Sequence, residues 1–380
     1  MRFLIVLASV FLFAAGGNAQ NRFVYLNNQS SPNYISAFQI NADGSLTQIA
    51  SSPITTGGQG YDSPMESMAI VYTHAGRVLY AANGGDPSVS GLRIDPSTGN
   101  LTPITGSPFP VLNDSTGTFD MAASPDNHFL FLSNSGNTVI HVYAISPETG
   151  ALTEIANSPF AADANINGLN VTANGKFLLA GGQSNQGVQG PLEVFAIAGS
   201  GAIAQVPGSP FAANASVSDI RSNCASNLVF TADNGSAYDD AYIMSMDGAP
   251  TPVAGSPFYN GATGNGPNSW DLAISPDGRF VFTSDSFSGD LTSFAVGREG
   301  ALSQANNSPF NTDVWLGGIA ITARGDYLYY TTFPSEPVVT GLRINPDGSL
   351  DSVSGASGTG VFAVNGESIS VISYPPPSCR

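Results

Sequence analysis

One eleven-residue pattern recurs along the chain and constrains its fold more than any other feature. The pattern reads GNLTPITGSPF at 99–109, GALTEIANSPF at 150–160, GAIAQVPGSPF at 201–211 and GALSQANNSPF at 300–310. The Ser-Pro that ends each copy returns about 50 residues later, a period typical of repeat architectures. A seventh, decayed copy, LDSVSGASGTG, occupies 350–360. The chain is therefore expected to be built from seven similar units.

Each repeat contains the same succession of short strand-like segments. In the sixth repeat these segments are SWDLAIS (269–275), RFVFTSD (279–285), DLTSFAV (290–296) and ALSQA (301–305). Apolar and polar residues alternate in them, and the PDG between the first two is turn chemistry. Four short strands in every repeat of this length are typical of β-propeller blades. We therefore predict an all-β fold: a single seven-bladed β-propeller with four antiparallel strands per blade.

The two ends of the repeat array predict how the ring closes. The first repeat begins at RFVYLNN (22–28), which matches a second strand, so it lacks an innermost strand. The chain ends on a spare segment, ESISVIS (367–373), which resembles ESMAIVY (66–72), the first strand of the second repeat. We therefore expect the C-terminal strand to complete blade one, which leaves no unpaired sheet edge in the hub.

The eleven-residue unit itself has a structural interpretation. Gly150 is expected to make a turn, and Leu152 and Ile155 to pack between blades. Pro159 is expected to end the outermost strand at an exposed edge, where a missing N–H costs no ladder hydrogen bond. Phe160 is then expected to bury its ring where the chain crosses to the next blade. The recurrence is thus architectural and predicts no ligand role.

Residues 1–19 have the composition of a secretory signal peptide. An apolar run from Phe3 to Ala15 is followed by small residues that end at Ala19. A membrane anchor is the weaker alternative, because this run is shorter than the roughly 20 residues that a span needs. We therefore predict a signal peptide over 1–19, a propeller over 20–380, and a secreted or periplasmic protein without a membrane span.

Composition restricts the partners. The chain has 11 Lys and Arg against 28 Asp and Glu, a formal net charge of −17, so it is expected to repel nucleic acids and anionic lipid surfaces. Its two cysteines, Cys224 and Cys379, do not form a metal-cluster pattern. Export permits a disulfide between them, and two free or buried thiols are the alternative. We expect a monomer.

Acidic residues are predicted to converge on the channel mouth. In a propeller the first strand of each blade starts at one face, here called the top face, so residues at its start point toward one axis. Five acids occupy such positions: Glu66, Asp120, Asp219, Asp271 and Glu367. Converging carboxylates either hold a cation such as Ca²⁺ through these five side chains or shift one another's pKa and act as acid and base. For catalysis we expect Glu66, Asp120 and Asp271.

Other top-face acids have a less specific interpretation. Asp233, Asp239 and Asp240 are predicted to lie in top loops or at top strand ends, where acids serve solubility and turn capping. No histidine is expected at the mouth, which argues against a Ser/His/Asp triad there. Arg221 is predicted to be the one basic residue in an innermost strand. It serves either as a plug that hydrogen-bonds carbonyls in the channel or as an anion or oxyanion contact.

Aromatic residues are also predicted near the mouth. Tyr61, Trp270 and Trp315 fall in or beside top loops. Aromatic side chains around a polar mouth suit stacking on a sugar ring, so these three are candidate substrate-binding residues. Packing against the protein itself is the alternative for each of them.

Four segments carry a family resemblance that covers the whole mature chain: AASPDNHFLFLSN (122–134), VTANGKFLLAGG (171–182), LAISPDGRFVFTSD (272–285) and GLRINPDGSL (341–350). They resemble the seven-bladed lactonase family, which includes bacterial 6-phosphogluconolactonases, and are also similar to YVTN-type propellers. The resemblance implies lactone hydrolysis at the channel mouth. Relatives commonly carry a basic residue, often an Arg-His pair, just ahead of an innermost strand. None of the matching positions here is basic.

Two functions follow as hypotheses. The first is an exported lactonase-like hydrolase that acts on a small neutral lactone or sugar-derived ring, with carboxylates of the mouth and possible help from a divalent ion. The second is a non-catalytic binding or scaffold propeller that presents its top loops to a glycan or a protein of the cell envelope. Because the mouth is acidic, a phosphorylated lactone is expected to be a poor substrate.

Overall fold

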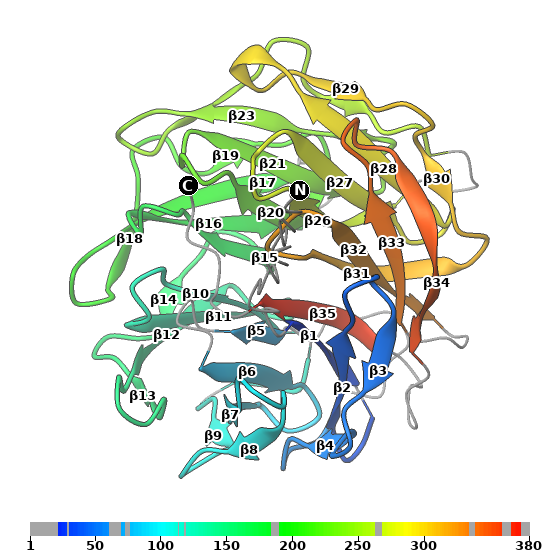
Figure 1. The fold of residues 1–380 in the computed structure, drawn as a ribbon. Coiled ribbons are helices and arrows are strands. Elements are labelled where there is room, and N and C mark those ends of the chain that lie inside the picture. Colours follow the sequence, from blue (N-terminus) through cyan, green and yellow to red (C-terminus); the bar gives the residue numbers. More distant parts are fainter. Residues whose placement is uncertain are drawn as a thin grey trace, which may run out of the picture.

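The computed structural model describes residues 22–28, 30–60, 70–72, 77–112, 114–117, 119–183, 190–262, 268–333, 339–358 and 366–373. Their strands form seven antiparallel sheets arranged as blades around a central axis (Figure 1). The innermost strands contact their neighbours in a closed cycle. The predicted seven-bladed β-propeller is therefore confirmed. The signal-peptide prediction falls outside the described residues.

Each blade runs from the hub outward through four strands. The innermost strands are β5 (Ile70–Tyr72), β10 (Phe119–Ala123), β15 (Ile166–Val171), β20 (Ser216–Ser222), β26 (Ser269–Ile274), β31 (Trp315–Ile321) and β35 (Gly366–Ser373). The second strands are β1 (Arg22–Asn28), β6 (Val78–Asn83), β11 (Phe129–Asn134), β16 (Phe177–Gly182), β21 (Leu228–Asn234), β27 (Phe280–Asp285) and β32 (Tyr327–Phe333). The third strands are β2 (Tyr34–Ile40), β7 (Ser88–Ile94), β12 (Val139–Ile145), β17 (Pro191–Ile197), β23 (Ala241–Met244), β28 (Asp290–Val296) and β33 (Val339–Ile344).

The outer part of the blades is less regular. The fourth strands are β3 (Leu46–Gln48), β8 (Leu101–Pro103), β13 (Leu152–Glu154), β18 (Ile203–Gln205), β24 (Pro250–Pro252), β29 (Leu302–Gln304) and β34 (Leu350–Gly358). Short continuations, β4 (Ile54–Thr55), β9 (Phe109–Pro110), β14 (Phe160–Ala161), β19 (Phe211–Ala212) and β30 (Phe310–Asn311), pair again with the third strand. In blade five, β22 (Tyr238–Asp239) and β25 (Phe258–Tyr259) form a separate ribbon, and a 3₁₀ turn, η1 (Arg298–Gly300), precedes β29. Within the described ranges, no helix is long and apolar enough to cross a membrane.

The ring closes as the sequence predicts. Strand β35 pairs antiparallel with β1, from Arg22 opposite Ser373 to Asn28 opposite Gly366. All seven residues of β1 are buried. The last strand of the chain thus supplies the innermost strand of the first blade and removes the open edge of β1.

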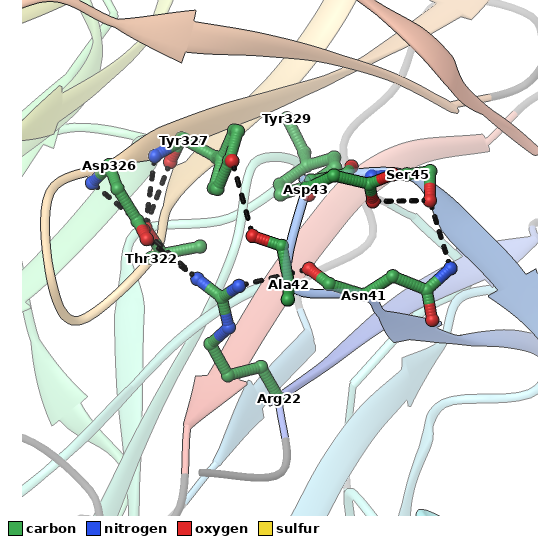
Figure 2. Close-up of polar contacts among 10 residues, drawn as sticks. Arg22, Asn41, Ala42, Asp43, Ser45, Thr322, Asp326, Tyr327 and Tyr329 are labelled. Carbon is green, nitrogen blue, oxygen red and sulfur yellow. Dashed lines mark hydrogen bonds and ion pairs between the residues drawn. The ribbon is translucent and has the colours of Figure 1, made fainter. Parts of the chain in front are cut away.

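A second contact joins the first and last blades (Figure 2). The Arg22 guanidinium, almost fully buried, binds both carboxylate oxygens of Asp326, at 2.9 and 3.0 Å, and donates to the Asn41 carbonyl at 3.0 Å. The Tyr329 hydroxyl donates to the Gly44 carbonyl at 2.8 Å. Closure therefore rests on the ion pair, in which Nη1 of Arg22 contacts both oxygens of Asp326, and on side-chain contacts as well as on the β35–β1 ladder.

The serine of the repeated unit has a role that the sequence analysis missed. Its Oγ accepts the backbone N–H of a third-strand residue at 2.9–3.1 Å, and the same residue's carbonyl accepts an N–H from the fourth-strand segment. The donor and serine pairs are Ala37 and Ser52, Gly91 and Ser107, Val142 and Ser158, Val194 and Ser209, Ala241 and Ser256, and Ser293 and Ser308. The serine hydroxyl therefore replaces one backbone rung where the chain bulges.

The expectation that Pro159 ends the outermost strand is wrong in one respect. The Ser158–Pro159 peptide bond is cis, and the chain then returns to the sheet, with Phe160 opposite Ile140. The Ser-Pro pair thus interrupts the outer strand and does not terminate it. Leu152 packs with residues of blades two and three, and Ile155 packs toward blade four, as predicted.

The glycine that opens each unit combines a positive φ with a close approach between blades. Gly201 has φ +85°, and a Cβ there would lie 2.4 Å from the ring of Phe129 in the preceding blade. The other six blades have the same arrangement, in which a side chain near the start of the second strand of the preceding blade lies against the glycine. These glycines are Gly44, Gly99, Gly150, Gly248, Gly300 and Gly348. The repeat retains glycine because a side chain would clash with the adjacent blade.

Replacing Gly201 by alanine is expected to lower the free energy of unfolding by about 2–4 kcal/mol, from the left-handed backbone and the overlap with Phe129. Urea unfolding of the purified variant measures this change in the free energy of unfolding. Gly199→Ala is the matched control, because a Cβ at Gly199 meets no atom within 4 Å. Equal stability of the two variants would show that the contact between blades tolerates a methyl group.

Candidate functional site

Three of the predicted mouth acids lie on innermost strands around the channel, in blades three, five and six. Asp120 is on β10, Asp219 on β20 and Asp271 on β26. Each carboxylate accepts a backbone N–H from the innermost strand of the next blade. The pairs are Asp120 with Leu169 (2.5 Å), Asp219 with Leu272 (3.1 Å) and Asp271 with Ile319 (2.7 Å). The carboxylates are therefore held in place by the hub and link adjacent blades.

Arg221 joins this group from β20. Its Nη1 lies 2.5 Å from Asp219 Oδ1, and its Nη2 lies 3.8 Å from Asp271 Oδ1. Nη1 also donates to the carbonyls of Leu169 and Ile220, at 3.3 and 3.0 Å. The side chain nevertheless keeps 35% of its surface exposed. Arg221 thus has the carbonyl contacts of a plug and an accessible guanidinium. The carbonyl contacts fit the plug interpretation and the exposed guanidinium fits the anion-contact interpretation.

The electrostatics of this group favour proton exchange near neutral pH. Burial raises the pKa of Asp120 to about 6, with a further contribution from Asp271, while Arg221 opposes the shift. Burial also raises the pKa of Asp219 well above its usual range, despite the ion pair with Arg221. Burial acts to lower the pKa of Arg221, but the three carboxylates raise it overall. One guanidinium thus faces three acids, and a proton is readily held among them.

The predicted metal site is only partly described. Glu66 and the side chain of Glu367 lie outside the described residues. Within the described ranges, no three His, Cys, Asp or Glu side chains form a group that could hold a metal ion. Asp120, Asp219 and Asp271 therefore do not make such a group by themselves. A calcium site that also uses Glu66 and Glu367 stays a prediction.

The aromatic candidates occupy different environments. Tyr61 lies outside the described residues, and Trp270 is half-buried within β26. Trp315, at the start of β31, is 46% exposed and packs edge to face against Phe287, with ring centroids 5.9 Å apart. Sequence reasoning missed Phe287. The available signal was an isolated aromatic residue in the short polar loop between Asp285 and Asp290.

Three aspartates of blade five form a second acidic group. Asp233, Asp239 and Asp240 have 0%, 1% and 5% of their surface exposed, so the expectation that they serve solubility is wrong. Asp240 accepts from the Ser256 and Tyr242 hydroxyls, at 2.9 and 3.0 Å. Neither carboxylate oxygen of Asp233 has a hydrogen-bond partner in the described part of the chain.

Burial disfavours ionisation of two of these carboxylates, those of Asp233 and Asp239. Burial raises the pKa of Asp239 to about 7. Burial, followed by the charges of Asp240 and Asp239, raises the pKa of Asp233 well above its usual range. Asp233 and Asp239 are therefore expected to retain protons at pH values where an exposed aspartate is ionised.

His141 belongs to a third buried group, within blade three. Its Nδ1 lies 2.8 Å from Glu154 Oε1 and its Nε2 lies 3.5 Å from Asp114 Oδ2. Ser158 donates to the same Glu154 oxygen while its Oγ accepts the Val142 N–H. His141 is only 1% exposed, so the centre of this Ser, His and acid combination is buried within the blade.

The cysteine alternatives are partly resolved. Cys224 is disulfide-bonded. Cys379, the other cysteine of the sequence, lies outside the described residues.

Comparison with known proteins identifies a family. The family model "Lactonase, 7-bladed beta-propeller" matches residues 18–111 and 107–207. A 6-phosphogluconolactonase of Pectobacterium carotovorum is 27% identical over 115 residues, which are 30% of this chain and 34% of that protein. The matched stretch thus spans about a third of the relative's length.

Solved structures agree on the fold. A candidate 6-phosphogluconolactonase from Bacteroides uniformis has 17% identity and a TM-score of 0.73, covering 93% of this chain and 99% of that one. The periplasmic gluconolactonase of Pseudomonas aeruginosa has 14% identity and a TM-score of 0.68, covering 89% and 97%. At these identities the likeness concerns architecture alone.

Proposed function

Since this chain belongs to the seven-bladed β-propeller lactonase family, we propose that it is an exported hydrolase of uncharged sugar lactones. The reaction is placed at the channel mouth, on the group of Asp120, Asp219, Asp271 and Arg221. The observation that carries the proposal is the partly exposed Arg221 guanidinium held among three carboxylates of the hub. It combines an oxyanion donor with groups that exchange protons near neutral pH.

The chemistry needs one base and one oxyanion donor. Asp120, with its pKa raised to about 6, is the general base that takes a proton from an attacking water. Arg221 donates to the carbonyl oxygen as it becomes an oxyanion. The bond between the carbonyl carbon and the ring oxygen then breaks, and the proton on Asp120 passes to that oxygen. The product is an open-chain hydroxy acid.

Asp219 and Asp271 act as positioning residues. The ion pair with Asp219 fixes the guanidinium, and the backbone contact between Asp271 and Ile319 fixes the neighbouring strand. Together with Asp120 they outnumber the single cation. A phosphorylated lactone would bring further negative charge into this acidic mouth, so the substrate is uncharged.

Export rests on the signal-like segment at residues 1–19. A periplasmic location would match that of the gluconolactonase of Pseudomonas aeruginosa, which shares the fold. The acidic composition suits a protein that has no nucleic acid or anionic membrane partner.

A binding or scaffold propeller at the cell envelope is the second candidate function. The contacts of Arg221 with the Leu169 and Ile220 carbonyls favour it, because they are those of a channel plug. An exposed aromatic pair on blade five, Tyr238 and Tyr259, would then offer a surface to a glycan or a protein.

Asp120→Asn is expected to lower kcat/KM for glucono-1,5-lactone by about a hundredfold or more, since the variant lacks a base. Lactone consumption is followed at pH 7 after subtraction of the spontaneous rate. Asp313→Asn, an exposed top-face acid outside the group, is the control and is expected to leave activity unchanged. For the wild-type protein, kcat/KM for the 6-phosphorylated lactone is expected to be at least about tenfold lower than kcat/KM for glucono-1,5-lactone.

The proposal fails if no uncharged lactone is turned over faster than in buffer, and the binding propeller then becomes the better explanation. It also fails in part if the phosphorylated lactone is the better substrate, because the acidic mouth would then not select against charge. Full activity in Asp120→Asn would remove Asp120 from the base role.

A further inference from the structure

The geometry points to a sugar-stacking subsite at the top of the seam between blades six and seven, formed by Trp315 and Phe287. We infer that the preferred substrate is an aldonolactone that carries a second, uncharged sugar ring. This inference rests on the proposed function for the reaction and extends it by naming the class of substrate.

The two aromatic side chains make an exposed platform. Trp315 is 46% and Phe287 38% exposed, and their rings meet at 79° with centroids 5.9 Å apart. Large aromatic side chains gathered on a surface mark a binding site more often than scattered ones do. The C–H face of a pyranose suits such a platform, because an aromatic ring is apolar on its face and tolerates a wet rim.

The platform is held rigidly by buried polar groups. Asp285, 3% exposed, accepts the N–H of Phe287 at 3.2 Å and that of Ser288 at 2.9 Å. Its other oxygen accepts the Asn268 N–H at 2.7 Å. A loop fixed before the ligand arrives loses little conformational entropy on binding, which is the property of a preorganised site.

The strand that carries Trp315 is tied to the same loop. The N–H of Leu316, next to Trp315, donates to the Ser286 carbonyl at 3.2 Å. A Cβ at Gly289, which has φ +73°, would lie 2.5 Å from the Val314 carbonyl oxygen. Loop and strand therefore pack without space for a side chain, and Phe287 and Trp315 keep their mutual position.

The platform lies on the seam that leads to the proposed reaction site. Four residues beyond Trp315 on the same strand, the Ile319 N–H donates to Asp271 Oδ2. Four strand residues span about 13 Å or less, and the bulge between Leu316 and Ile319 shortens the distance. A disaccharide can span that interval, with one ring on Trp315 and the lactone ring beside Asp271 and Arg221.

The test compares a disaccharide lactone with a monosaccharide lactone. Wild-type kcat/KM is expected to be about tenfold higher for cellobiono-1,5-lactone than for glucono-1,5-lactone. Trp315→Ala is expected to remove that preference by lowering kcat/KM for the disaccharide lactone about tenfold, whereas Trp315→Phe retains most of the preference. Met246→Ala, which removes an exposed apolar side chain from blade five outside any proposed binding surface, is the control and is expected to retain the preference.

A binding measurement separates this inference from the proposed function. Cellobiitol has no lactone to hydrolyse, and its binding is measured by isothermal titration calorimetry, which does not depend on Trp315 as the reporter. Binding that weakens about tenfold in Trp315→Ala and not in Met246→Ala supports the subsite even if no lactone is hydrolysed. Turnover of both lactones with equal efficiency, and unchanged by Trp315→Ala, would overturn it, as would failure of cellobiitol to bind the wild-type protein.

Discussion

Deletion of residues 366–380 is expected to lower the melting temperature by about 10 °C or more, or to leave the chain insoluble. The deletion removes β35, which pairs with β1 along its whole length. It also breaks the cycle of innermost strands, because β35 contacts both β31 and β5. The core residues Phe23 and Tyr25 of β1, now fully buried, would be left on an open sheet edge.

The decisive control is a shorter deletion, of residues 374–380, which leaves β35 in place. It removes Cys379, so it separates the effect of the strand from that of the cysteine. We expect the shorter deletion to retain soluble protein with a melting temperature well above that of the longer one. Thermal unfolding followed by circular dichroism measures both. Equal melting temperatures of the longer deletion and the wild type would show that β35 contributes nothing to closure.

The sequence predicted the fold closely because each blade follows the same local rules. The expected segments at 22–28 and 290–296 coincide with β1 and β28. Turn residues and strand alternation are read over a few residues, and the repeat supplies seven independent observations of them. Closure by the C-terminal strand needed only the observation that one repeat lacks a first strand and the chain end has a spare one.

The role of the repeated serine could not be predicted in the same way. Ser158 accepts the N–H of Val142, a residue on the adjacent strand, and this contact exists only once the two strands are paired. From the sequence, the following proline looked like a strand end, because proline lacks an N–H. The sheet instead continues at Phe160, since the serine hydroxyl satisfies the rung that the bulge leaves open.

The candidate site was predicted in part for a related reason. Propeller topology places the start of each first strand at the mouth, so the positions of Asp120, Asp219 and Asp271 followed from the repeat. The burial of Asp239 did not, because YDDAY has the appearance of a polar loop. In the structure, Tyr238 and Asp239 form a ribbon with β25, which leaves Tyr238 exposed and Asp239 inside. Adjacent residues of a strand point to opposite faces, so a register shift of one residue would exchange the exposure of Tyr238 and Asp239.

Asp239→Asn is expected to make the protein more stable than the wild type above pH 7. Burial raises the pKa of Asp239 to about 7, so the folded protein binds this proton more tightly than the unfolded chain does. Between about pH 4 and pH 7 the folded state therefore holds more protons, and the wild type loses stability as the pH rises. A shift of this size corresponds to on the order of 4 kcal/mol across that interval.

Asparagine cannot ionise, so the variant is expected to lose this part of the pH dependence and to match the wild type most closely near pH 4. A smaller slope is expected to remain, because the pKa of Asp233 is also raised. Urea unfolding at intervals from pH 4 to pH 8 measures the difference between the two proteins, with Asp313→Asn as a charge-matched exposed control that is expected to parallel the wild type. A difference that stays constant over this range would mean that Asp239 ionises in the folded protein as it does in the unfolded chain, with its negative charge stabilised within the blade.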